Sequence, residues 1–233
     1  MPNLIETIGF EIFINGIFEE ETSNFFASRL PANGVFLDLG ANIGTVSIPL
    51  IDKRPDIKVI CVEAAPWIFN YLQKNLSRNQ MKDSIAVNKV LFYSDNEEVN
   101  FYSPDDKFGK GSLSPVFTDK VVKVKTIKID SLLKELKIEK VDIIKIDVEG
   151  YEYHVFKGAI ELLSREDAPD ILLEFADWAE ENAKGVTIGA SQQILKEMGY
   201  RIYYFSEKGT MKETETILKR GFFMLFATKM NIR

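Results

Sequence analysis

The stretch Val35-Phe36-Leu37-Asp38-Leu39-Gly40-Ala41-Asn42-Ile43-Gly44 decides the fold of this chain. Four of its first five residues are apolar, which is typical of a parallel strand covered on both faces. Gly40 and Gly44 lack a Cβ, so the backbone there can turn sharply and come close to a ligand. The stretch therefore predicts a buried strand that turns tightly into a helix, as nucleotide-binding folds begin.

The spacing of these glycines excludes two common nucleotide motifs. A dinucleotide fingerprint, G-x-G-x-x-G, would need glycine where Asn42 and Thr45 stand, and the sequence has no G-x-x-x-x-G-K-[ST] phosphate loop. The remaining pattern, D-x-G-x-N-x-G, suits a small ligand with a cationic or zwitterionic part near Asp38. S-adenosylmethionine fits that description. A structural turn with a chance acid is the alternative interpretation.

Length and composition limit the classes of function. A chain of 233 residues is most economically one domain, 1–233, because domains usually hold roughly 100–200 residues and α/β domains run longer. The net charge of −6 argues against broad attraction to nucleic acid or to an anionic membrane. The single cysteine, Cys61, excludes an internal disulfide and a thiolate-rich metal site.

The sequence also lacks the usual signals for export or membrane insertion. No Lys or Arg precedes an apolar run in residues 1–10, so a signal peptide is not expected. No stretch of about 18 apolar residues is present to span a bilayer. We expect a soluble, cytoplasmic protein without a nucleic-acid or membrane partner, and the sequence leaves its oligomeric state open.

Strand-like and helix-like segments alternate from residue 35 onward, which predicts a parallel sheet with helical crossovers. Strands are expected at 35–39, 58–62, 85–92, 141–146, 171–175, 200–205 and 222–228, and helices at 43–53, from 66, at 152–163 and at 191–198. Residues 94–130 interrupt this alternation as a small β insertion. Residues 1–34 are expected to form a short hairpin, 10–14, and a helix, 19–30.

The connector between the last two strands is polar and poor in helix signals, so it does not predict a right-handed crossover. The two strands should therefore form an antiparallel pair at the edge of the sheet. The expected fold is α/β and Rossmann-like, a seven-stranded, mostly parallel sheet with an antiparallel edge strand. This is the architecture of class I S-adenosylmethionine-dependent methyltransferases.

Three separated blocks carry a resemblance to a known family: Asp38-Leu39-Gly40-Ala41-Asn42-Ile43-Gly44, Glu63 with Pro66, and Lys145-Ile146-Asp147-Val148-Glu149-Gly150-Tyr151-Glu152. The third block, followed by Lys157-Gly158-Ala159, is the most discriminating. Over about residues 34–175 the chain resembles the FkbM family of S-adenosylmethionine-dependent methyltransferases, and it departs from the family at Ala64, where proline is usual. The resemblance implies methyl transfer from S-adenosylmethionine to a hydroxyl oxygen, often on a sugar, glycan or glycosylated metabolite, which leaves S-adenosylhomocysteine.

Candidate cofactor-binding residues lie at the ends of the first three strands. Glu63 follows the second strand, where a carboxylate can accept both ribose hydroxyls; capping of the next helix is the alternative. Asp38 either holds the methionyl amino group or stabilises the glycine turn, and Asn42 serves the turn or the ligand carboxylate. The full candidate set is Asp38, Gly40, Asn42, Gly44 and Glu63, with Asn88 and Ser94 proposed for the adenine.

Candidate catalytic residues follow the fourth strand. Asp147 stands where acceptor and methyl group should meet, so we expect it to be the general base or to orient the acceptor hydroxyl. Glu149 is expected to hydrogen-bond the acceptor; a Mg²⁺ ion held with Asp147 is an open alternative, and no metal is predicted. Lys145 lies on the same sheet face as Asp147, either to assist it, to contact the acceptor or to form a buried ion pair. Glu152 falls in the first turn of the next helix, where we expect its carboxylate to interact favourably with the helix dipole.

Other functions fit the sequence less well. A nucleic-acid base methyltransferase would need a [DN]-P-P-[YF] element, where this chain has Asp147-Val148-Glu149-Gly150. A non-catalytic binding domain with the same fold has no physical need for acids at three strand ends. A methyltransferase for a non-sugar small molecule stays open, because the sequence does not identify the acceptor.

Overall fold

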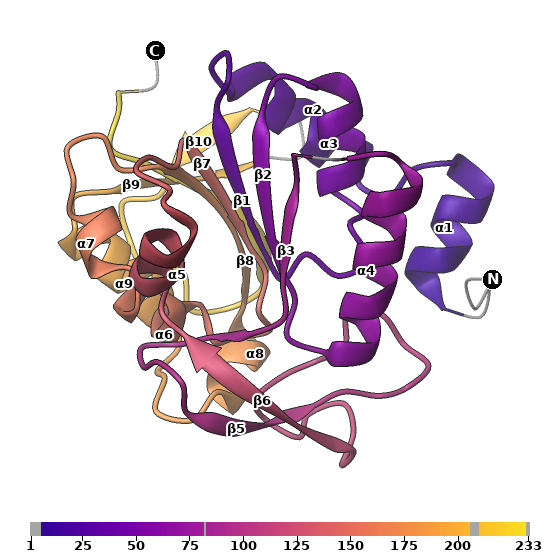
Figure 1. Cartoon of the computed structure of the whole chain (residues 1–233). Coiled ribbons are helices and arrows are strands. Elements are labelled where there is room, and N and C mark those ends of the chain that lie inside the picture. The colour runs from indigo at the N-terminus through magenta and orange to yellow at the C-terminus, as the bar shows by residue number, and fades with distance from the viewer. Residues whose placement is uncertain (1–5, 82, 206–209, 232–233) are drawn as a thin grey trace.

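The computed structural model describes residues 6–81, 83–205 and 210–231, and its centre is a sheet between two layers of helices (Figure 1). Within these residues the sheet has eight strands in the order β10-β9-β11-β8-β7-β1-β2-β3. Their bounds are β1 Val35–Leu39, β2 Lys58–Val62, β3 Ile85–Val87, β7 Ile143–Ile146, β8 Asp170–Ala176, β9 Arg201–Phe205, β10 Met211–Glu213 and β11 Phe222–Thr228. Strands β3, β2, β1, β7 and β8 are parallel neighbours, which confirms the predicted Rossmann-like fold.

Two details of the predicted sheet are wrong. The reversed strand β11 does not lie at the edge, because it pairs antiparallel with β8 on one side and with β9 on the other. The strand count was one too low, because β10 adds a three-residue antiparallel strand beside β9. This short strand lies in a connector rich in Lys and Glu, which carries no alternation of apolar residues to reveal it.

A second, three-stranded sheet has the order β4-β6-β5 and consists of β4 Val90–Leu91, β5 Glu98–Tyr102 and β6 Val121–Ile127. It takes the place of the expected β insertion and also takes residues 90–91 from the predicted strand 85–92. In Figure 1 it lies at the bottom, below the end of the main sheet at which α4 begins. It therefore faces the carboxyl ends of the parallel strands, where ligands bind in such folds.

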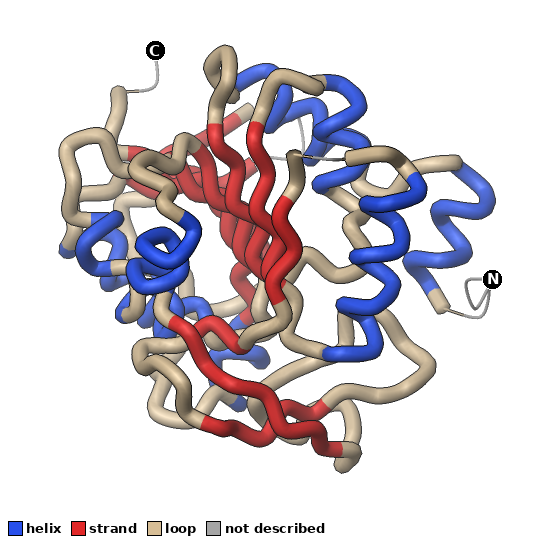
Figure 2. Tube along the Cα trace, in the orientation of Figure 1, coloured by secondary structure: helices blue, strands red, loops and turns tan. Residues whose placement is uncertain are grey.

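The helices cover both faces of the main sheet, so the strands in Figure 2 run between two groups of helices. The bounds are α1 Thr7–Asn15, α2 Glu20–Arg29, α3 Ser47–Lys53, α4 Pro66–Arg78, α5 Ile129–Leu136, α6 Glu152–Lys157, α7 Ile160–Leu163, α8 Asp177–Asn182 and α9 Ala190–Glu197. One apolar core joins the sheet to α2, α3 and α4, and the other joins it to α5, α6, α7 and α9. No described helix combines the length and the apolar character needed to cross a membrane.

Three helices differ from the expectation. Helix α1 replaces the expected hairpin because the Glu6 carboxylate caps its first turn and Gly16 ends it in the left-handed conformation. Helix α3 begins only at Ser47, so Pro49 falls in the first turn, where its missing N–H costs nothing. The predicted helix 152–163 is divided into α6 and α7 at Gly158, where the chain passes so close to Phe92 that a Cβ would lie 2.2 Å from its carbonyl oxygen.

Candidate active site

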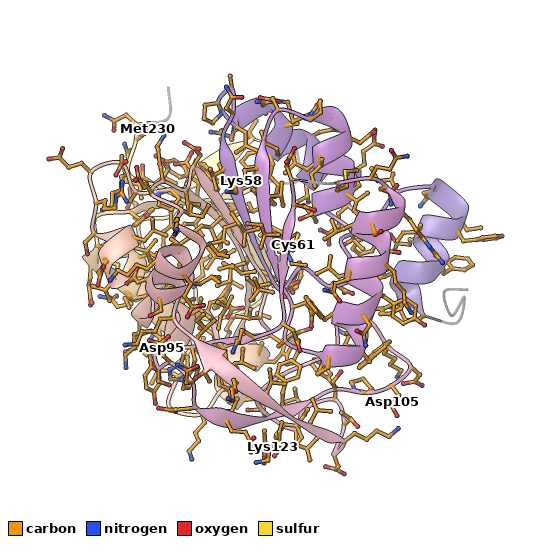
Figure 3. The ribbon with its side chains drawn as sticks, viewed as in Figure 1. Lys58, Cys61, Asp95, Asp105, Lys123 and Met230 are labelled. Carbon is orange, nitrogen blue, oxygen red and sulfur yellow. The ribbon has the colours of Figure 1, made fainter. Side chains whose placement is uncertain are left out.

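A cavity of about 620 Å³ lies at the carboxyl ends of β1, β2, β7 and β8. The loop between β5 and β6 contributes residues 106–111 and Leu113 to its lining, and the first turn of α1 contributes Thr7 and Ile8. In Figure 3, Cys61 of β2 lies near the centre of the molecule, surrounded by side chains. Lys123 of β6 and Asp105 of the loop between β5 and β6 lie in the lower part of the same view. The volume falls within the ~300–1,000 Å³ usual for small-molecule sites.

The turn after β1 is held against the end of β7. Gly40 has a φ of +79°, and a Cβ built on it would lie 1.9 Å from the carbonyl oxygen of Asp147, so only glycine fits. The backbone N–H groups of Gly40 and Ala41 both donate to the carbonyl oxygen of Val62 at 3.0 Å. Asn42 has a φ of +53°, a conformation that asparagine tolerates better than most residues. The turn therefore brings the ends of β1, β2 and β7 together.

Glu63 is buried at the end of β2 and faces the cavity. Its Oε2 accepts a hydrogen bond from the Asn42 N–H at 3.0 Å, and its Oε1 accepts one from the Ala65 N–H at 2.8 Å. Burial raises the pKa of Glu63 to about 7, although both backbone donors oppose the rise. An ionised carboxylate has about four acceptor positions, so each oxygen keeps capacity for a ligand hydroxyl.

Lys145 lies beneath the site as part of a buried ion pair. Its Nζ donates to the carbonyl oxygen of Gly40 at 3.0 Å and lies 3.7 Å from Oδ1 of Asp38 and 3.7 Å from Oδ2 of Asp147. Burial alone would lower the pKa of Lys145, but the charges of Asp147 and Asp38 outweigh this effect, so the pKa of Lys145 is above its ordinary value. Asp38 also accepts a hydrogen bond from the Ser47 hydroxyl at 2.6 Å. These contacts favour the support role for Lys145 that the sequence left open.

The loop after β7 aims Glu149 into the cavity. Glu149 adopts a left-handed φ of +54°, which is rare for a residue with a side chain, and its carboxylate lies 3.9 Å from Nζ of Lys110. Burial, followed by the charge of Asp147, raises the pKa of Glu149 to about 8. Oε1 of buried Glu152 accepts the Val148 N–H at 3.0 Å, so Glu152 braces this loop from inside the protein.

The structure brings together six of the ten predicted site residues on the cavity lining: Gly40, Asn42, Glu63, Lys145, Asp147 and Glu149. Asp38 and Gly44 are not part of the lining and support the turn from behind it. Asn88 is not part of the lining either, since its amide donates to the carbonyl oxygens of Glu63 and Ala64 and so fixes the backbone beside the acid. Ser94 also lies off the lining, with a buried hydroxyl that has no hydrogen-bond partner among the described residues.

Several lining residues were not predicted. The apolar part of the lining includes Ile68, Val90, Phe101 and Phe108, and Phe108 stacks on Trp67 with ring centroids 5.2 Å apart. Phe108 and Lys110 belong to a loop whose sequence has no spacing that reveals a site. Glu174, near the end of β8, could have been found by the rule that singled out Glu63 and Asp147, since it is also an acid near a strand end.

The residues present fit S-adenosylmethionine. An apolar part of the lining with aromatic side chains suits adenine, and the carboxylate of Glu63 suits the ribose hydroxyls. The acidic side chain of Asp147, on the same lining, suits a cationic sulfonium. Within the described part of the chain, no group of three or more His, Cys, Asp or Glu side chains is arranged to hold a metal ion.

Fold and cavity thus match the class of S-adenosylmethionine-dependent methyltransferases. The methyltransferase FkbM domain matches residues 38–202, and the chain belongs to this family, which confirms the resemblance seen in the sequence. The precorrin-6y C5,15-methyltransferase of Geobacter metallireducens shares the fold with a TM-score of 0.52 and 14% identity, over 92% of this chain and 90% of that one.

Two relatives are similar in sequence. The methyltransferase sdnD of Sordaria araneosa is 29% identical over 164 residues, which cover 58% of this chain and 63% of the relative. The hexuronic acid methyltransferase AglP of Haloferax volcanii is 26% identical over 140 residues, which cover 60% and 56%. The chain therefore spans less than two thirds of the length of these curated relatives.

Proposed function

We propose that this chain is an O-methyltransferase that uses S-adenosylmethionine to methylate a hydroxyl of a sugar, glycan or glycosylated metabolite. The observation that carries the proposal is that Glu63 and Asp147 line one cavity from the ends of β2 and β7, the two strands that flank β1. When bound, S-adenosylmethionine supplies an activated methyl group on a sulfonium.

The donor-binding roles follow from the lining. Glu63 accepts the two ribose hydroxyls, since its carboxylate is buried and already oriented by two backbone donors. The apolar part of the lining, with Phe101 and Phe108, encloses the adenine. The turn from Gly40 to Asn42 holds the methionine part. Asp38 and Gly44 act indirectly by fixing that turn.

Asp147 acts as the general base in this proposal. Its carboxylate takes the proton that the acceptor hydroxyl loses while that oxygen bonds to the methyl carbon and the bond from carbon to sulfur breaks. General-base assistance contributes about 10²–10⁴-fold, and positioning supplies most of the remaining acceleration. Lys145 stabilises the Asp147 carboxylate from 3.7 Å, and Glu149 hydrogen-bonds the acceptor.

A sugar acceptor is supported by the family resemblance and by the hexuronic acid named for the relative AglP. The net charge of −6 argues for a small molecule or glycan over nucleic acid. A cytoplasmic location is part of this proposal, as the sequence led us to expect.

The test is methyl transfer from radiolabelled S-adenosylmethionine to a panel of sugars, glycosides and non-sugar alcohols. We expect Asp147→Asn to lower kcat about 10²-fold or more, while calorimetry shows unchanged affinity for S-adenosylhomocysteine. Asp167→Asn is the control, since Asp167 pairs with Arg165 on the surface before β8. Normal turnover by Asp147→Asn would refute the base, and transfer only to non-sugar alcohols would refute the sugar acceptor. Donor binding without any transfer would favour a non-catalytic binding domain.

A further inference from the structure

Glu174 is a cavity-lining carboxyl group that the proposed reaction leaves without a role. The last paired residues of β7 and β8 are Ile146 and Leu173, so Asp147 and Glu174 follow them side by side. Neighbouring strands lie ~4.8 Å apart, and residues aligned across parallel strands project from the same face of the sheet. The two carboxyl groups therefore stand next to each other at the end of the cavity where the acceptor hydroxyl is proposed to lie.

The charged groups around Glu174 come from three segments. Asp147 and Lys145 belong to the β7 end, Glu19 precedes α2, and Lys110 belongs to the loop between β5 and β6. On the other side, β11 places Met224 opposite Glu174 and adds no charge. Within the described residues, no hydrogen bond or ion pair engages the Glu174 carboxyl group. Glu174 is thus oriented toward the cavity but has no partner in the protein that uses its hydrogen-bonding capacity.

The two neighbouring carboxyl groups differ in their environment. Burial, followed by the charge of Asp147, raises the pKa of Glu174 well above its ordinary value. Lys145 lies 3.7 Å from Asp147 and stabilises its carboxylate. Two carboxyl groups this close cannot both ionise at low cost. Asp147, beside the ammonium of Lys145, is therefore the hydrogen-bond acceptor of the pair, and Glu174, which burial favours in its protonated form, is the hydrogen-bond donor.

We propose that Glu174 binds the oxygen adjacent to the hydroxyl that is methylated, so that the site selects an acceptor with two neighbouring hydroxyls, as on a sugar ring. Asp147 accepts the proton of the reacting hydroxyl, and Glu174 donates a hydrogen bond to the oxygen on the neighbouring carbon. This inference rests on the proposed function and narrows its acceptor to vicinal diols. An acceptor with one isolated hydroxyl would leave the carboxyl group of Glu174 desolvated and unpaired, which is unfavourable.

The test compares Glu174→Gln, which keeps a donor and the shape of the side chain, with Glu174→Leu, which removes both hydrogen-bonding atoms. The probes are methyl α-D-glucopyranoside, methyl α-D-mannopyranoside and methyl β-D-galactopyranoside, each with its monodeoxy analogues. Methyl transfer gives kcat and KM, and saturation-transfer NMR on the enzyme loaded with S-adenosylhomocysteine gives acceptor binding. Affinity for S-adenosylhomocysteine and the Tm of each variant show whether the protein stays folded.

We expect the wild type to favour a diol over the analogue that lacks the neighbouring hydroxyl by about tenfold or more in kcat/KM. Glu174→Leu should lose this preference through a higher KM for the diol, and Glu174→Gln should keep most of it. An unchanged preference in folded Glu174→Leu would overturn the inference and leave the proposed function standing. If the wild type binds S-adenosylhomocysteine but neither binds nor methylates any of the glycosides, the sugar acceptor is refuted and the inference is refuted with it.

Discussion

Replacement of Lys145 by methionine tests whether the buried ion pair supports the site. Methionine keeps the length of the side chain but removes the ammonium that lies 3.7 Å from Asp38 and 3.7 Å from Asp147. Asp38 would then stay buried with Ser47 as its remaining hydrogen-bond donor, and the carbonyl oxygen of Gly40 would lose its Lys145 donor. Loss of one partner of a buried pair costs about 3–5 kcal/mol, so we expect Lys145→Met to lower the free energy of unfolding by that amount.

The coupling free energy between Asp38 and Lys145 is measured with a double-mutant cycle, from urea unfolding at pH 7. Asp38→Asn alone should cost less than Lys145→Met, because Lys145 keeps Asp147 and the Gly40 carbonyl as partners. The double variant Asp38→Asn with Lys145→Met should recover about 2 kcal/mol relative to the sum of the two single changes, since no unpaired charge is left at position 38. A loss below about 1 kcal/mol in Lys145→Met, or simple additivity in the double variant, would refute this reasoning.

Backbone geometry, titration and the attachment of the small sheet give three further predictions. Gly40→Ala should lower the free energy of unfolding by at least about 3 kcal/mol and abolish S-adenosylhomocysteine binding. The control, Gly199→Ala, should cost about 1–2 kcal/mol, because Gly199 has a similar φ of +88° but open space where a Cβ would lie. Equal losses for the two variants in urea unfolding would contradict the close contact at Gly40. Because Glu63 has a pKa of about 7 and binds ribose when ionised, calorimetric affinity for S-adenosylhomocysteine should fall about tenfold from pH 8 to pH 6, and Glu63→Gln should remove this part of the pH dependence. The Tyr151 hydroxyl lies 2.8 Å from the Ser114 hydroxyl, so Tyr151→Phe should lower the free energy of unfolding by about 0.5–1.5 kcal/mol, and an unchanged urea midpoint would show that this hydrogen bond does not stabilise the fold.

The site residues that the sequence predicted lie in or directly after a strand or a tight turn. Gly40 must be glycine because β7 passes so close, and Glu63 and Asp147 follow apolar strands whose ends meet at one edge of the sheet. Such features are visible in a single sequence, because strand, turn and acid are adjacent in the chain. The predicted strand 85–92 failed for a nonlocal reason, since the amide of Asn88 donates to carbonyl oxygens at the end of β2 and the chain then leaves the main sheet.

The lining residues and the helix that the sequence did not predict depend on contacts with residues far away in the sequence. Phe108 and Lys110 reach the cavity only because the loop between β5 and β6 is attached to the body, for example by the hydrogen bond from Trp67 to Ser103. Helix α1 has β-branched and aromatic residues that favour a strand, but Ile8 and Ile12 pack on the small core beside the cavity and stabilise a helix. Tertiary contacts therefore decided these elements, and no local pattern revealed them.

A crystal structure with S-adenosylhomocysteine tests the central claim most directly. We predict that both ribose hydroxyls hydrogen-bond to the carboxylate of Glu63, that the adenine lies in the apolar part of the lining beside Phe108, and that the sulfur faces Asp147. A nucleoside bound in the cavity with its ribose away from Glu63, or with its sulfur away from Asp147, would contradict the account.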